Sequence, residues 1–133
     1  MYLIDTNIWI ERMIDGPKSD EVGELLNRFT SDELHVSEFT LHSMAMLLKR
    51  RSQDALYTRW TLDLFVDGGA KLISLIPDEI KRILRTMDQY RLDYHDAYQY
   101  TAAEKYDLTL VSYNEAYDGT PLGRKSPGKL LVL

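Results

Sequence analysis

The first seven residues of the chain constrain its fold most strongly. Tyr2, Leu3 and Ile4 form a short apolar run that ends at Asp5, and an amphipathic stretch over residues 8–13 follows a polar Thr-Asn pair. Such a run is typical of a buried strand, and the stretch after it is typical of a helix. Ligands and catalytic groups gather at the carboxyl ends of parallel strands in open α/β sheets. We therefore expect Asp5 to lie at the functional edge of a sheet.

The same alternation of apolar runs and helical patterns continues along the chain. Strands are predicted over residues 2–5, 34–37, 71–75, 108–112 and 130–132. Helices are predicted over residues 7–13, 40–51, 55–66, 77–91 and 94–106, with a further helix that Ser19 caps. Strands that alternate with helices form a parallel sheet covered on both faces. The prediction is an α/β fold: a single three-layer domain over residues 1–133, with a central parallel sheet flanked by helices.

The composition limits the class of protein. The chain has 133 residues, a net charge of −5 and no cysteine, so disulfides and thiolate metal sites are excluded. No apolar stretch is long enough to cross a bilayer, and we expect a cytoplasmic protein without a membrane partner. A general nucleic-acid coat protein would be basic. An acidic balance is compatible with a nuclease, because carboxylates that hold a divalent cation add negative charge.

Several acidic or amide side chains follow predicted strands or begin predicted helices. They are Asp5, Glu38, Asp96, Asn114 and Asp118. If the sheet is parallel, these groups can converge at one edge, where their mutual repulsion calls for a neutralising cation. Mg²⁺ prefers carboxylate and water oxygens. A hydrolase acting on phosphodiester bonds is the chemistry that such a centre supports.

Structural roles explain each of these residues equally well when it is taken alone. Asp93 has the position of a helix cap, and Asp96 three residues later completes a pattern like a capping box. Glu38 is a suitable first-turn acid, and Asp118 a suitable loop residue. The functional interpretation depends on convergence, which a single sequence leaves open.

Four short segments together resemble the PIN-domain family, of the VapC-like ribonuclease toxin type. They are Leu3-Ile4-Asp5-Thr6-Asn7, Val36-Ser37-Glu38-Phe39-Thr40, Asp93-Tyr94-His95-Asp96-Ala97 with Ala102-Ala103, and Leu110-Val111-Ser112-Tyr113-Asn114 followed by Tyr117-Asp118. The resemblance implies a Mg²⁺- or Mn²⁺-dependent endoribonuclease, the toxin of a type II toxin–antitoxin pair that binds a small antitoxin and forms a homodimer.

The resemblance also implies roles for individual residues. Asp5 and Asp96 would bind the metal. Glu38 is not part of the family pattern, but it follows Ser37 directly, and we expect its carboxylate to reach the site as a further catalytic residue. The expected supporting residues are Asp93, Asn114, Asp118, Thr6, Asn7 and Ser112. The basic loop over residues 123–129 lies close in sequence to Asn114, so Arg124 and Lys125 are the expected contacts to RNA.

Two positions depart from the family pattern. Ser43 stands where the family usually has a glutamate, six residues after the serine of its second strand, and Asn114 stands where the family often has an aspartate. These departures motivate an alternative, a PIN fold that has lost catalysis and binds RNA or protein. A flavodoxin-like or receiver-type protein is a weaker alternative, because the first strand ends in a single aspartate rather than an acidic pair.

Overall fold

Four parallel strands form the central sheet of the computed structural model, which describes residues 1–132. The strands are β1 (Tyr2–Ile4), β2 (Leu34–Ser37), β3 (Lys71–Ile73) and β4 (Thr109–Val111). Their order across the sheet is β3-β2-β1-β4, and every neighbouring pair is parallel. The predicted α/β class with a central parallel sheet is confirmed.

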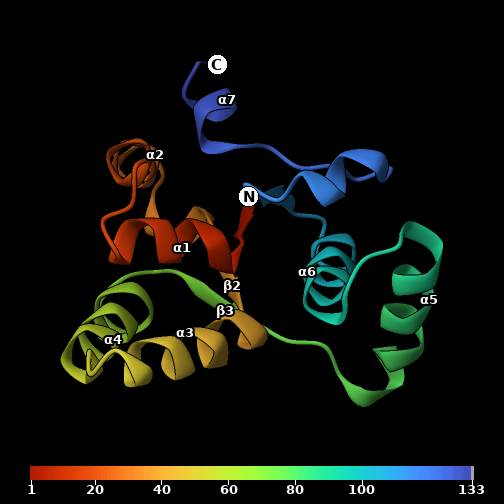
Figure 1. The fold of residues 1–133 in the computed structure, drawn as a ribbon, viewed down its shortest axis with the longest axis horizontal. Coiled ribbons are helices and arrows are strands. Elements are labelled where there is room, and N and C mark those ends of the chain that lie inside the picture. Colours follow the sequence, from red (N-terminus) through yellow and green to blue (C-terminus); the bar gives the residue numbers. More distant parts are fainter. Residues whose placement is uncertain (133) are drawn as a thin grey trace.

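Helices cover both faces of this sheet (Figure 1). One group packs on one face and consists of α1 (Thr6–Met13), α2 (Ser19–Arg28), α3 (Glu38–Arg50) and α4 (Asp54–Thr61). The other face is covered by α5 (Ile80–Tyr90) and α6 (Tyr94–Lys105). The last element described is α7 (Pro127–Leu131), which packs against α2. Short helical turns make up the rest: η1 (Ser31–Glu33), the π-helical η2 (Leu62–Val66), η3 (Pro77–Glu79) and η4 (Glu115–Gly119).

The strand residues supply two separate apolar cores by simple alternation. Leu3 and Leu110 face α5 and α6, whereas Ile4 and Val111 face α1 to α4. All four side chains are at most 1% exposed. Successive side chains of a strand point to opposite faces, so strands this short can bind helices on both sides only if nearly every residue is apolar.

The predicted strand over residues 130–132 is wrong, because this segment belongs to α7 and its end. Ser126 caps α7 by accepting a hydrogen bond from the Lys129 amide at 3.3 Å, and Pro127 occupies the first helical position. Proline there has a backbone angle suited to a helix and lacks an amide that would go unpaired. The Ser-Pro pair therefore decided the conformation, although Leu130, Leu131 and Val132 read as a strand.

The predicted cap of the second helix is also wrong. Lys18 is the N-cap residue of α2 and makes no side-chain capping bond. Ser19 is buried inside the helix, where its hydroxyl accepts a hydrogen bond from the Arg12 guanidinium at 3.2 Å. Because α1 packs against α2, the Ser19 hydroxyl bonds to Arg12 of α1 and does not cap α2. Within residues 1–132, no helix is long and apolar enough to cross a membrane.

Polar residues cap the elements that begin at the carboxyl edge of the sheet. Asp5 follows β1 and caps α1, Ser37 ends β2 and caps α3, and Asn114 follows β4 and caps η4. Asp93 caps α6, whose first turn lies at the same edge. These parallel strands therefore bring four distant polar segments together.

Candidate metal centre

Asp5 lies at the centre of this edge and is 2% exposed. Its Oδ1 accepts hydrogen bonds from the Thr6 backbone amide at 2.8 Å and from the Gln99 side-chain amide at 2.9 Å. Its Oδ2 accepts a hydrogen bond from the Ser112 hydroxyl at 2.7 Å. Three separate segments, at the start of α1, within α6 and after β4, thus hold one carboxylate. Charge-assisted bonds of this kind are strong.

Within the described part of the chain, Asp5 is the one acceptor for the hydroxyl proton of Ser112. The Ser112 oxygen accepts hydrogen bonds from the Asn7 side-chain amide at 3.0 Å and from the Asn114 backbone amide at 2.9 Å. The hydroxyl therefore donates to Asp5. Asn7 in turn accepts a hydrogen bond from the Tyr113 amide at 3.1 Å. The structure thus brings Ser112 into direct contact with the Asp5 carboxylate and places Asn7 next to Ser112.

Asp96 lies in the first turn of α6, where two neighbours orient it. The Asn114 side-chain amide donates to its Oδ2 at 2.8 Å. The buried Tyr117 hydroxyl donates to its backbone carbonyl at 3.2 Å and lies 3.4 Å from its Oδ1. The Asp93 carboxylate accepts a hydrogen bond from the Asp96 backbone amide at 2.8 Å, so Asp93 is the predicted cap of α6.

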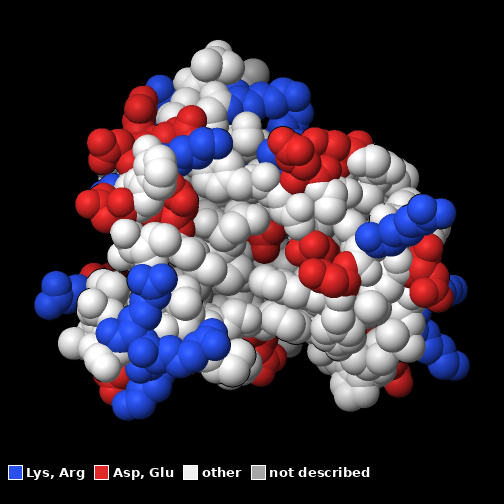
Figure 2. Space-filling model, in the orientation of Figure 1, with Lys and Arg blue, Asp and Glu red and all other residues white. Residues whose placement is uncertain are grey.

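Negative charge at this edge is poorly compensated. Burial raises the pKa of Asp96 above its usual range, and the carboxylates of Asp93 and Asp5 raise it further. The pKa of Tyr117 is raised by burial first and then by the charges of Asp5 and Asp96. Within residues 1–132, no lysine or arginine forms an ion pair with either aspartate. Figure 2 shows acidic atoms at the centre of this face, between the halves that carry α1 and α6.

Among residues 1–132, His95 is the one basic side chain that the structure places close to the acidic pair. Its Nε2 lies 3.0 Å from the Thr6 hydroxyl and 3.9 Å from Asp5 Oδ1. Its ring stacks on Phe39 with a centroid separation of 4.6 Å. The stacking joins the start of α6 to the start of α3, so His95 helps to hold the two sides of the site together.

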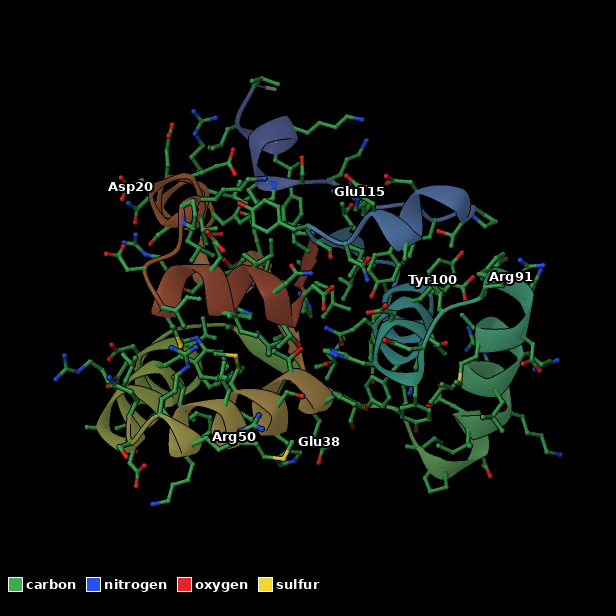
Figure 3. The ribbon with its side chains drawn as sticks, viewed as in Figure 1. Asp20, Glu38, Arg50, Arg91, Tyr100 and Glu115 are labelled. Atoms are coloured by element: carbon green, nitrogen blue, oxygen red, sulfur yellow. The ribbon has the colours of Figure 1, made fainter. Side chains whose placement is uncertain are left out.

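Two of the predicted acidic residues do not contact Asp5 or Asp96. Glu38 pairs with His42 one turn later on α3 at 3.4 Å, and its side chain is 50% exposed. It points away from the gap between α1 and α6 (Figure 3). Asp118 instead forms a two-point ion pair with Arg124, with distances of 2.9 and 3.1 Å.

The two predicted RNA contacts lie in a segment that is tied to β4. Arg124 donates a further hydrogen bond to the Ser112 carbonyl at 3.1 Å, so its guanidinium already has partners. The Lys125 backbone pairs with β4 through its amide, which donates to Leu110 at 2.8 Å. Within the part of the chain that the structure describes, the Lys125 side chain forms no hydrogen bond or ion pair.

Sequence reasoning missed the buried network behind Asp5. Gln99 and Thr40 are fully buried, and the Gln99 amide donates to the Thr40 hydroxyl at 2.9 Å. The Ser37 hydroxyl donates to Gln99 Oε1. One signal was present in the sequence: Gln99 lies three residues after Asp96 on the same helical face, and Ala102 and Ala103 follow one turn later.

The donor set fits a hard divalent cation that keeps several waters. Two carboxylates converge where burial and the charges of Asp93 and Asp5 raise the pKa of Asp96. Mg²⁺ is usually bound in this way, by one or two carboxylates plus water. No group of three or more His, Asp or Glu side chains suited to a metal occurs among residues 1–132.

Comparisons with known proteins agree on a single fold. The family model described as PIN domain matches residues 2–121. A toxin–antitoxin complex from Klebsiella pneumoniae contains a chain of 24% identity with a TM-score of 0.75, covering 96% of this chain and 98% of that one. FitAB bound to the IR36 DNA fragment gives 14% identity and a TM-score of 0.77, covering 96% and 95%.

A third solved structure is VapBC2 from Rickettsia felis bound to a promoter DNA fragment. It gives 17% identity and a TM-score of 0.67, covering 94% of this chain and 97% of that chain. No curated protein matches this chain.

Proposed function

Because this chain belongs to the PIN domain family, we propose that it is a metal-dependent endoribonuclease and the toxin of a type II toxin–antitoxin pair. One observation carries the proposal: Asp5 and Asp96 converge at the carboxyl edge without a lysine or arginine partner in residues 1–132. Metal-dependent hydrolases need such an arrangement, since the cation replaces the missing positive charge.

Asp5 and Asp96 are the proposed ligands of Mg²⁺ or Mn²⁺. When bound, such a cation would activate a water and stabilise the departing oxygen of the phosphodiester. Ser112 and Thr6 hold the Asp5 carboxylate, while Asn114 and Tyr117 hold Asp96. Asp93 positions the helix that carries Asp96. We leave Glu38 out of this proposal, because its exposed carboxylate contacts His42 and not Asp5 or Asp96.

RNA is the proposed substrate, and the Lys125 side chain is the proposed phosphate contact. An acidic centre repels the phosphate backbone, so a cation at its border is needed to hold the substrate. Arg124 contributes indirectly, since its bonds to Asp118 and to the Ser112 carbonyl fix the segment that carries Lys125.

An antitoxin is the proposed partner, because solved relatives of the same fold include toxin–antitoxin complexes. A groove of about 890 Å³ between α3 and α4 offers a seat for it. The groove is lined by apolar side chains and by charged ones, among them Arg50 and the ion pair of Lys49 with Asp54 at 2.6 Å. Figure 2 shows basic atoms over these helices. The proposed occupant is an amphipathic segment of the antitoxin that places an acidic side chain opposite Arg50. We also propose that the chain forms a homodimer.

Calorimetric titration of the purified protein with Mn²⁺ tests the metal centre directly. We expect saturable binding by the parent and its loss in Asp5→Asn and Asp96→Asn. Asp118→Asn is the matched control, because it also removes a carboxylate near this edge but one that pairs with Arg124. Cleavage of a mixed pool of RNA in Mg²⁺, with EDTA as the blank, tests the activity. Cleavage that persists in EDTA, or in Asp5→Asn, contradicts the mechanism.

The second candidate function is a binding module without catalysis. Ser43 and Asn114 favour it, because they leave two carboxylates where the family pattern has more. This alternative predicts RNA or partner binding that is independent of divalent cations. A parent protein that binds no Mn²⁺ up to millimolar concentration, yet binds RNA in EDTA, would establish it.

A further inference from the structure

We propose that Gln99 is a positioning residue that orients the Asp5 carboxylate for the cation. The inference rests on the proposed metal centre, and its evidence is the set of bonds made by a single buried amide. Gln99 is 0% exposed and uses both ends of its side chain. Its nitrogen donates to Asp5 Oδ1 and to the Thr40 hydroxyl, both at 2.9 Å.

The chemistry of the neighbours determines which end of the amide faces Asp5. An ionised carboxylate can only accept hydrogen bonds. The opposite orientation would place the amide oxygen against Asp5 Oδ1 and leave two electronegative atoms in contact without a proton. In the orientation observed, the Ser37 hydroxyl donates to Gln99 Oε1. Ser37 on β2 and Gln99 on α6 thus form one polar chain that ends at Asp5.

This chain makes the two oxygens of Asp5 unequal. Oδ1 accepts two short bonds, from the Thr6 amide and from Gln99, which use its two lone pairs. Oδ2 accepts one short bond, from Ser112 at 2.7 Å, while the Asn7 amide lies at 3.5 Å. Oδ2 therefore keeps the capacity for a further partner. Gln99 saturates one oxygen and reserves the other for the cation.

Loss of Gln99 would release this constraint without removing a ligand. The Asp5 carboxylate could then rotate about its terminal bond. Oδ1 would keep the bond from the Thr6 amide and have a free lone pair in place of the bond from Gln99. Substitutions of residues that orient metal ligands typically reduce metal affinity by about 10- to 100-fold. A site with only two converging carboxylates is expected to lie within that range, because few other ligands compensate for a misplaced one.

Gln99→Met tests the inference, because methionine has similar length and no hydrogen-bonding amide. We expect Mn²⁺ affinity in calorimetry to fall by about tenfold or more, with the cooperative thermal transition retained. Thr101→Val is the matched control, because Thr101 is a fully buried polar residue of the same helix. Its hydroxyl lies 3.5 Å from the Thr86 hydroxyl and makes no contact with Asp5. The Mn²⁺ affinity of Thr101→Val should equal that of the parent. Equal affinity in Gln99→Met and the parent overturns the inference.

A crystal structure of metal-free Gln99→Met provides a second measurement that needs no metal. We expect the Asp5 carboxylate to rotate from the orientation seen here. If it keeps the same orientation, the inference is wrong, whether or not the parent binds Mn²⁺. Failure of the parent to bind Mn²⁺ would instead contradict the proposed function. Should Gln99→Met not fold, Gln99→Asn, which is one methylene shorter and keeps the amide, takes its place in both measurements.

Discussion

Asn114 donates a hydrogen bond from its side-chain amide to Asp96 Oδ2 at 2.8 Å, which joins the end of β4 to the first turn of α6. An amide here satisfies an acceptor without adding charge. The bond opposes the rise in the pKa of Asp96 that burial and neighbouring carboxylates cause. Asn114 therefore stabilises the metal-free site, whereas an aspartate would add repulsion.

Asn114→Asp should shift this balance toward the metal-bound state. A third carboxylate would replace a hydrogen-bond donor, so the metal-free protein should unfold at a lower temperature. Mn²⁺ should bind about tenfold more tightly, since charge on the ligands increases affinity for hard cations. Thermal unfolding in EDTA and calorimetry in Mn²⁺ measure the two effects. Unchanged affinity would show that residue 114 lies outside the reach of the cation.

Asp96→Asn should stabilise the metal-free protein at neutral pH. The pKa of Asp96 is raised above its ordinary value of 3.8, so the folded protein holds this proton more tightly than the unfolded chain does. The free energy of unfolding therefore falls as the pH rises from the pKa of the unfolded state to the higher pKa of the folded state. Above the folded-state pKa this loss of stability stays constant. We expect the variant to melt a few degrees higher, on the order of 2–4 °C, at pH 7.

The gain from Asp96→Asn should disappear near pH 3, where the parent carboxyl is protonated in both states. Saturating Mn²⁺ should raise the melting temperature of the parent but not that of the variant. Melting curves of both proteins between pH 3 and pH 8, with and without Mn²⁺, measure this. Identical curves at pH 7 in EDTA would contradict the assigned electrostatics.

Ser43→Glu should add the carboxylate that the family pattern carries at this position. Ser43 lies one turn after Thr40 on α3, and Thr40 is in contact with Gln99 in the network behind Asp5. We expect tighter Mn²⁺ binding, by about tenfold, and faster RNA cleavage. His42→Glu is the control, because it places the same charge on the exposed side of α3. Equal effects of the two substitutions would indicate a general charge effect.

Met44→Ala should test the core that supports α3. Met44 is 0% exposed, and loss of its side chain should lower the free energy of unfolding by about 2–5 kcal/mol. Met46 on the same helix is 61% exposed, and Met46→Ala should change the free energy of unfolding by less than about 0.5 kcal/mol. Urea denaturation followed by circular dichroism measures both. A small effect at Met44 would mean that the core can collapse around the gap.

Local sequence patterns were sufficient for the elements and for their class. Apolar runs as short as Tyr2–Ile4 and Thr109–Val111 read as strands because both faces of a covered parallel sheet are buried. Caps such as Asp93 could be read because a cap depends on neighbours within three residues. The same local reading failed for α7, where Ser126 and Pro127 outweighed the apolar residues that follow them.

The sequence by itself determined that this chain forms an α/β domain with Asp5 and Asp96 at element ends, since periodicity and capping are properties of contiguous residues. Only the tertiary structure decided which polar groups meet. The strand order β3-β2-β1-β4 places β1 beside both β2 and β4, and so brings Ser37 and Ser112 to either side of Asp5. The tertiary structure also placed Gln99 behind Asp5. These contacts join segments distant in the chain, and no local propensity encodes them.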